Sequence, residues 1–81
     1  MTQQSAFHNL IAGRFVHEII GPTIKSGATD SELMVIFESA QLAVLEVLHC
    51  HYRLTPQKAT DMCEASLQRA IERFAGLRRV A

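Results

Sequence analysis

Apolar residues along the chain recur at spacings of three and four, which is the period of one face of a helix. Three stretches show this pattern, and two joints that carry Gly or Pro separate them. Alternation of period two, which would indicate a strand, is absent from the sequence over any useful length. We therefore predict an all-α fold with three helices, at about residues 4–20, 30–53 and 56–75.

The second predicted helix is long and has clear signals at both ends. Gly and Pro are absent between Ala28 and Thr55, and this stretch is rich in good helix formers. Its start reads T-D-S-E, a capping box in which Thr29 and Glu32 each bind the other's backbone amide. Its end is set by Thr55 and Pro56, which together open the next helix with a cap and a proline at the first helical position.

The ends of the other two helices depend on glycine and proline. The pair Gly21-Pro22 is expected to stop the first helix, and Gly13 weakens that helix by roughly 1 kcal/mol relative to Ala. Gly76 is expected to stop the third helix, which leaves residues 76–81 as a frayed tail.

The apolar stripes of the second and third helices match residue by residue if the two form a long antiparallel hairpin. In this register the N-terminal helix lies across the open end, and His51 is the polar residue of the seam beside the tip. The matched pairs, from the open end to the tip, are Leu33 with Leu77, Phe37 with Phe74, Ala40 with Ala70, Val44 with Leu67, Val47 with Cys63, and His51 with Ala59.

The apolar surface exceeds what this seam uses. Hydrophobic residues make up 48% of the 81-residue chain and the mean hydropathy is +0.10, which is much for a single small bundle to cover. Additional apolar or small residues form second faces on the first two helices, and we expect them to make a homodimer interface rather than to pack inside one bundle. The expected interface residues are Leu10, Gly13, Met34, Gln41, Leu45 and Tyr52.

Charge and cysteine content fit one small soluble domain spanning residues 1–81. Eight basic and eight acidic residues cancel, so no global field favours nucleic acid or an anionic membrane. Residues 1–52 carry two basic and five acidic residues (net −3), and residues 53–81 carry six and three (net +3). Two cysteines, no signal segment and no apolar run longer than five residues indicate a cytoplasmic protein without membrane partners.

The run His49-Cys50-His51 resembles a metal-binding cluster. On a helix, however, residues two apart point about 200° away from each other, so His49 and His51 cannot chelate one ion. A site made by His8, His51 and Cys63 from different helices is the weaker alternative. We therefore expect no metal and no cofactor.

Other candidate chemistry is generic. Lys25 and Ser26 lie beside the amides of a helix start, which is an anion-binding arrangement, although capping explains the same residues. Arg69 and Arg73 could contact phosphates, although acidic residues on the same helix oppose this. Nucleophile motifs and paired carboxylates are absent from the sequence, so enzymatic activity is not expected.

These observations favour a small helical protein-interaction module, an adaptor, regulator or inhibitor, that acts as a homodimer and binds a further protein. Two alternatives from other classes stay open. One is a nucleic-acid-associated regulator that uses the Arg-bearing third helix and tail. The other is a small-ligand sensor with a pocket between helices, near His8, His51 and Tyr52.

Overall fold

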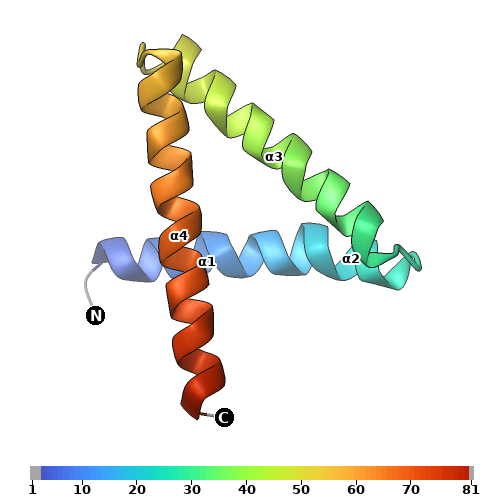
Figure 1. The fold of residues 1–81 in the computed structure, drawn as a ribbon. Helices are drawn as coiled ribbons and strands as arrows, with labels where there is room; N and C mark the ends of the chain where they lie inside the picture. Colours follow the sequence, from blue (N-terminus) through green and yellow to red (C-terminus); the bar gives the residue numbers. More distant parts are fainter. Residues whose placement is uncertain (1–2, 81) are drawn as a thin grey trace. The chain divides into compact units, whose positions relative to one another are not determined.

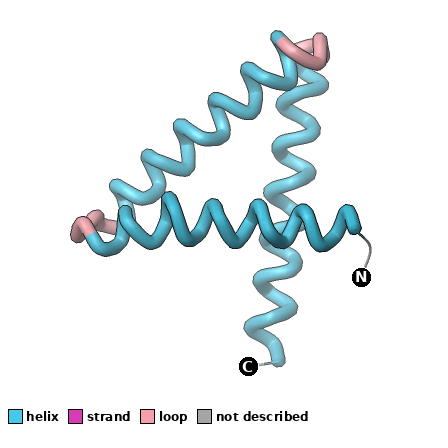
Figure 2. Tube along the Cα trace, turned by 180° about the vertical axis from the view of Figure 1, so that it is seen from behind, coloured by secondary structure: helices cyan, strands magenta, loops and turns pink. Residues whose placement is uncertain are grey.

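The protein is all-α, as the sequence predicts (Figures 1 and 2). The computed structural model describes the backbone of residues 3–80 and the side chains of residues 6–79, and this part of the chain contains no strand. The first helical stretch comprises α1 (Gln3–Phe15), a π-helical turn η1 (Val16–Ile20) and α2 (Gly21–Lys25). The second is α3 (Asp30–Cys50) and the third is α4 (Pro56–Val80).

The chain divides into two units, and the boundary falls inside α3. The first unit is Met1–Ile36 and the second is Phe37–Ala81. The first unit contains α1, η1, α2 and the first turns of α3. The second contains the rest of α3, the tip that follows it (residues 51–55), and α4.

The prediction that Gly21-Pro22 stops the first helix is wrong, because helical structure continues through this pair to Lys25. Proline lacks an N–H and its ring clashes with the carbonyl four residues earlier in a regular α-helix. Here the preceding turn widens into the π-helical η1, and the Gly21 amide donates to the carbonyl of Val16, five residues back. The Thr23 hydroxyl also donates to the Ile19 carbonyl at 2.7 Å. The wide turn therefore accommodates the proline.

Gly27, rather than Gly21, ends this first helical stretch. Its φ of 85° is left-handed, a conformation that favours glycine. The Gly27 amide donates to the Ile24 carbonyl at 3.0 Å and the Ala28 amide donates to the Thr23 carbonyl at 3.4 Å. These two bonds form a Schellman motif, which satisfies the last carbonyls of the helix.

The predicted capping box at the start of α3 is confirmed. The Glu32 amide donates to the Thr29 hydroxyl at 3.2 Å, and the Thr29 amide donates to the Glu32 carboxylate at 3.2 Å. Each residue thus satisfies a backbone donor that the helix itself leaves unpaired.

Helix α3 ends at Cys50, earlier than the predicted end near residue 53. The His51 amide still donates to Val47, four residues back, at 2.9 Å, but the next bonds span five and six residues: the Tyr52 amide donates to Val47 at 3.2 Å and the Leu54 amide to Leu48 at 3.1 Å. Arg53 then takes a left-handed conformation with a φ of 59°. The helix therefore ends in a widened last turn, after which the chain reverses its direction.

Helix α4 starts as predicted and ends later than predicted. The Lys58 amide donates to the Thr55 hydroxyl at 3.1 Å, and Pro56 occupies the first helical position. At the other end, the helix continues through Gly76 to Val80, so the predicted stop at Gly76 is wrong. A glycine ends a helix by turning left-handed, and within residues 3–80 the positive φ values belong to Gly27 and Arg53.

The predicted seam between the second and third helices is closed only next to the tip. The tip-proximal Ala59 is buried, but Val44, Val47, Leu67 and Phe74 are between 43% and 59% exposed. The two helical segments of the second unit diverge from the tip (Figure 1). We call the two exposed rows the α3 stripe (Phe37, Ala40, Val44 and Val47) and the α4 stripe (Cys63, Leu67, Ala70, Phe74 and Leu77).

Candidate interaction surfaces

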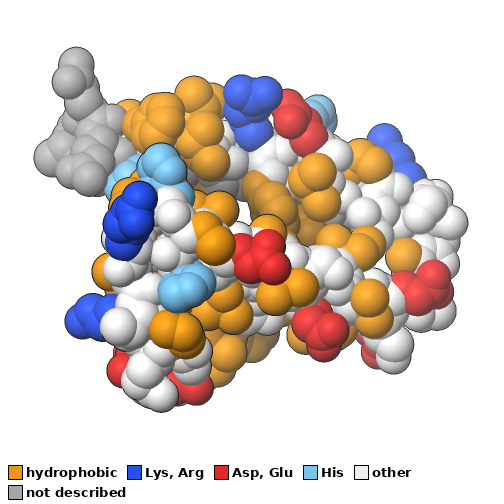
Figure 3. All heavy atoms as spheres, turned by 90° about the horizontal axis from the view of Figure 1, so that it is seen from above, with side chains coloured by type: hydrophobic (Ala, Val, Ile, Leu, Met, Phe, Trp, Pro, Cys, Tyr) orange, Lys and Arg blue, Asp and Glu red, His pale blue; other side chains and the backbone are white. Residues whose placement is uncertain are grey.

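Exposed apolar side chains are the dominant surface feature of the chain (Figure 3). Among the side chains of residues 6–79, Ala59 alone is buried, with 1% of its surface exposed. Soluble monomers bury most large apolar side chains and expose only small apolar patches. The large hydrophobic side chains that are exposed here are Phe7, Leu10, Ile11, Phe15, Val16, Ile19, Ile24, Met34, Val35, Phe37, Leu42, Val44, Val47, Tyr52, Met62, Leu67, Ile71, Phe74 and Leu77.

The residues predicted to form a dimer interface remain accessible in the single chain. Leu10, Met34 and Tyr52 are about 60% exposed (60%, 58% and 63%), and Gln41 and Leu45 are half-buried. A Cβ added at Gly13 would meet nothing within 4 Å, so another helix has room to approach its backbone. Leu10 and Gly13 belong to the first unit, whereas Gln41, Leu45 and Tyr52 belong to the second.

Helix α3 is long and apolar enough to cross a membrane, judged by length and composition alone. None of the residues in its most apolar window is buried. The helix reaches this level although no unbroken apolar run exceeds five residues, because Glu38 and Glu46 are far apart among apolar neighbours. A helix from the core of a soluble protein has the same composition, so α3 also fits a surface that another protein covers.

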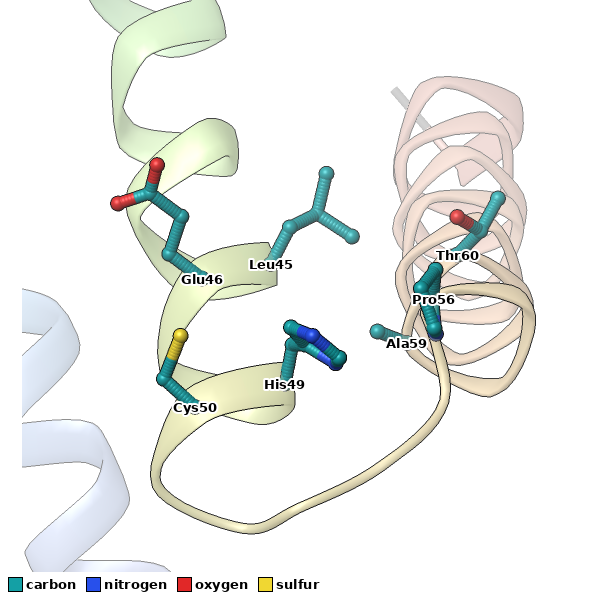
Figure 4. Close-up of a pocket in the computed structure, with 7 residues that line it drawn as sticks. All are labelled: Leu45, Glu46, His49, Cys50, Pro56, Ala59 and Thr60. Carbon is teal, nitrogen blue, oxygen red and sulfur yellow. The ribbon is translucent and has the colours of Figure 1, made fainter.

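A groove with a volume of about 380 Å³ lies beside the tip of the second unit. Leu45 and His49 point from α3 toward Ala59 and Pro56 at the start of α4, whereas Glu46 and Cys50 point away from α4 (Figure 4). The groove is therefore mainly apolar, and it is not the pocket near His51 and Tyr52 expected for a ligand sensor. Its lining residues are Leu45, Glu46, His49, Cys50, Pro56, Ala59 and Thr60.

His49, not His51, is the histidine that hydrogen-bonds to the tip after α3. Its Nδ1 lies 2.7 Å from the carbonyl oxygen of Leu54. A carbonyl can only accept, so Nδ1 carries the proton and donates it. The His49 side chain is exposed, and the sequence does not reveal its partner because that partner is a backbone group beyond the helix end. The signal that could have found it is a histidine in the last turn of a helix followed by a tight joint.

His51 lies after the end of α3 and its side chain is exposed. Its ring contacts Tyr52 edge-on, with the centroids 4.8 Å apart. His8 contacts Phe7, with the ring centroids 6.2 Å apart. Within the described residues there is no cluster of three or more metal-ligating side chains.

The joint between α2 and α3 uses its donors internally. The Ser26 hydroxyl donates to the Thr23 carbonyl at 2.7 Å, and the amides of residues 26–28 donate to carbonyls of the preceding helix. At the start of α3 the Ser31 amide donates to the Asp30 carboxylate at 2.7 Å. Carboxylates of Asp30 and Glu32 thus occupy the helix start where an anion would bind, and the Lys25 side chain is exposed beside it.

The arginines of α4 are exposed along its C-terminal half. Arg69 and Arg73 are one helical turn apart, and Arg78 and Arg79 lie in the last turn. The Arg78 guanidinium lies over the Phe74 ring, 5.2 Å from its centroid. The ion pair that the structure shows among the described residues is in the first unit, between Arg14 and Glu18 at 3.2 Å.

Comparison of the chain with known protein families, with curated proteins and with solved structures found no match.

Proposed function

We propose that this protein is a small helical interaction module, an adaptor, regulator or inhibitor, that acts as a homodimer and binds a further protein. The observation that carries the proposal is the burial pattern: large apolar side chains on all the major helices are exposed, and Ala59 is the buried one among residues 6–79. Exposed apolar surface of this extent is typical of protein–protein interfaces.

The well-formed helices support this proposal. Both joints are closed by specific hydrogen bonds, including the capping box of α3 and the His49 bond to Leu54. Within residues 6–79 the chain therefore specifies its helices locally, but not a hydrophobic core. Helices with defined ends and uncovered apolar faces are suited to associate with other helices.

Light scattering over a range of micromolar concentrations tests the homodimer. We expect a mass near twice the 9.0 kDa of one chain. Met34 and Val35 provide a matched pair of variants, because they are 58% and 61% exposed but point about 100° apart on α3. We expect Met34→Lys to dissociate the dimer and Val35→Lys to leave it intact. A wild-type mass of one chain at all concentrations would contradict the proposal.

A second candidate function is nucleic-acid association through α4, which the exposure of Arg69, Arg73, Arg78 and Arg79 favours. Titration with duplex DNA at two salt concentrations tests it, because binding through phosphates weakens steeply as salt rises. If Arg69→Ala with Arg73→Ala leaves DNA binding unchanged, this candidate is eliminated.

A further inference from the structure

The α3 stripe has the residue spacing of a helix that pairs with another helix. Its four residues follow one another at intervals of three, four and three, which is the heptad pattern of a coiled coil. Phe37, Val44 and Val47 are 41%, 50% and 51% exposed, and Ala40 is half-buried. The stripe therefore has the form of a helix-pairing surface that the single chain leaves accessible.

Helix α4 lies on another side of α3. Leu45 and His49 are the α3 residues that point toward the start of α4 (Figure 4). At about 100° per residue, they lie about 120° and 160° around the helix axis from the centre of the α3 stripe. Within the second unit, α4 therefore does not cover the stripe.

The acidic residues of this part of α3 also lie far from the stripe. Glu38 and Glu46 are each about 140° from its centre, on opposite sides of the helix. A second α3 could therefore approach the stripe without bringing carboxylates together. The residues that border the stripe on its two sides are uncharged, and they are Ile36, Gln41, Ala43, Leu48 and Cys50.

The order of side-chain sizes along the stripe fits a second α3 that runs in the opposite direction. An antiparallel register centred on residue 42 places Phe37 opposite Val47 of the second copy, and Ala40 opposite Val44 of the second copy. Because the pair is twofold symmetric, each of these contacts is made twice. A larger side chain then meets a smaller one in every layer, which fills the contact evenly. A parallel pair would instead place Phe37 against Phe37 and Ala40 against Ala40, so that a crowded layer would lie next to a thin one.

Gln41 distinguishes the two directions in a second way. It is half-buried and lies about 80° from the centre of the stripe, and Ala43 lies about 80° away on the other side. In an antiparallel twofold pair each border faces the same border of the second copy, so Gln41 faces Gln41. Two facing carboxamides can each donate an N–H to the carbonyl oxygen of the other. In a parallel pair Gln41 would face Ile36, which offers its amide no hydrogen-bonding partner.

We propose that α3 pairs with α3 of a second copy in antiparallel orientation through the α3 stripe, with the twofold axis beside Gln41. The proposal rests on the proposed homodimer and specifies its central contact. Met34 lies on the same side of the stripe as Gln41, about 100° from its centre, whereas Val35 lies about 160° from it. The pairing therefore gives the same order of effects for lysine at these two positions as the proposed homodimer.

Opposite charges at residue 41 test the pairing. Gln41→Glu and Gln41→Lys each place like charges face to face in their own homodimers, so we expect each dissociation constant to rise by about tenfold or more at low salt. In a mixed dimer the two charges are opposite. Native mass spectrometry of an equimolar mixture, with one chain labelled with ¹⁵N, should therefore show predominantly the heterodimer.

Leu42 provides the matched control for this experiment. It is the next residue along α3, it is exposed, and it lies about 180° from the centre of the stripe. Leu42→Glu and Leu42→Lys should therefore dimerise as wild type does, and their mixture should contain the three dimers in statistical proportion.

Distances between spin labels give a readout that leaves the contact unaltered. Leu42→Cys and Ser31→Cys place labels on the side of α3 away from the stripe, in chains whose native cysteines Cys50 and Cys63 are replaced by alanine. With a rise of 1.5 Å per residue, the antiparallel register separates the two labels at residue 31 by about 33 Å along the axis and keeps those at residue 42 level. Double electron–electron resonance should therefore give a much longer distance for Ser31→Cys than for Leu42→Cys.

The outcomes separate this inference from the homodimer itself. If wild type is a dimer but the residue 41 variants mix in statistical proportion, or the two label distances are equal, the antiparallel pairing is overturned and the homodimer stands. If wild type is monomeric at all concentrations, both proposals fail. Sedimentation of monomeric wild type with anionic vesicles would assign the stripe to a lipid surface and also overturn the pairing.

Discussion

His49 shows how one side chain determines the geometry of the tip. It bonds the Leu54 carbonyl at 2.7 Å and lines the groove beside Ala59. The side chain of His51, two residues later, is exposed and contacts the Tyr52 ring. The same residue type thus has a structural role at one position and a surface position at the other, because the helix ends between them at Cys50.

Replacing His49 by Ala should destabilise the protein by about 0.5–1.5 kcal/mol, because the Leu54 carbonyl loses its side-chain donor. Denaturant unfolding at fixed protein concentration measures the change. His51→Ala is the matched control and should leave the free energy of unfolding within about 0.5 kcal/mol of wild type. Equal losses at the two positions would contradict the assigned role of His49.

Gly27 has a left-handed backbone conformation that residues other than glycine rarely adopt. Its φ is +85°, and a Cβ at this position would meet nothing within 4 Å. A side chain here would therefore cost free energy through the backbone conformation and not through a clash with a neighbour. Gly27→Ala should therefore reduce the free energy of unfolding by about 1 kcal/mol, and Gly27→Asn by less, because Asn tolerates left-handed backbone. Thermal unfolding of the two variants measures this. A gain in stability for Gly27→Ala would indicate an ordinary helical φ instead.

At the scale of the element, the first helical stretch shows that proline can be present without ending a helix. The wide turn η1 places Pro22 where its missing donor and its ring are tolerated. The turn adds one residue to a helical repeat, so the side chains before and after it are not in one regular α-helical register. The wide turn also explains why the Gly21-Pro22 pair does not mark the end of the stretch.

Pro22→Ala should change the stability of this stretch by only about 1 kcal/mol or less, because the wide turn η1 already accommodates the ring and the missing donor. Cα chemical shifts of wild type and variant, measured by NMR, report the helix directly. Both should be helical through Lys25, with the larger change at Val16–Ile20. Random-coil shifts from Gly21 onward in wild type would contradict the continuous helix.

The existence of the helices could be predicted from sequence, and so could the ends where side chains make the decisive bonds. Thr29 with Glu32 and Thr55 with Pro56 are local signals, and the structure confirms both starts. The ends set by backbone conformation could not be predicted. Gly21 and Gly76 resemble stops, yet the left-handed residues are Gly27 and Arg53.

The candidate surfaces could be predicted only in part. Leu10, Met34 and Tyr52 are exposed, but so are most of the large apolar side chains of residues 6–79, so exposure does not single out the second face and that interface stays a prediction. The apolar periodicity predicts which residues of the second and third helices can pair. It does not show whether the two paired helices belong to the same chain. The bond from His49 to Leu54 was missed because it depends on the path of the chain after Cys50.

At the scale of the whole molecule, local structure is well specified and burial is almost absent. In proteins, most of the stability of a helix comes from tertiary packing of its apolar face rather than from helix propensity. Among residues 6–79 that burial amounts to one alanine side chain. If a second copy covers exposed apolar faces of the helices, folding and association are coupled, and stability depends on protein concentration.

Thermal unfolding followed by circular dichroism over a hundredfold range of concentration tests this claim most directly. Because association is expected to supply the missing burial, the midpoint should rise steadily with concentration, and helix content should fall on dilution. Met34→Lys should lower the midpoint at every concentration and Val35→Lys should not. A cooperative transition whose midpoint is the same at all concentrations would show that one chain folds by itself, and would contradict the account.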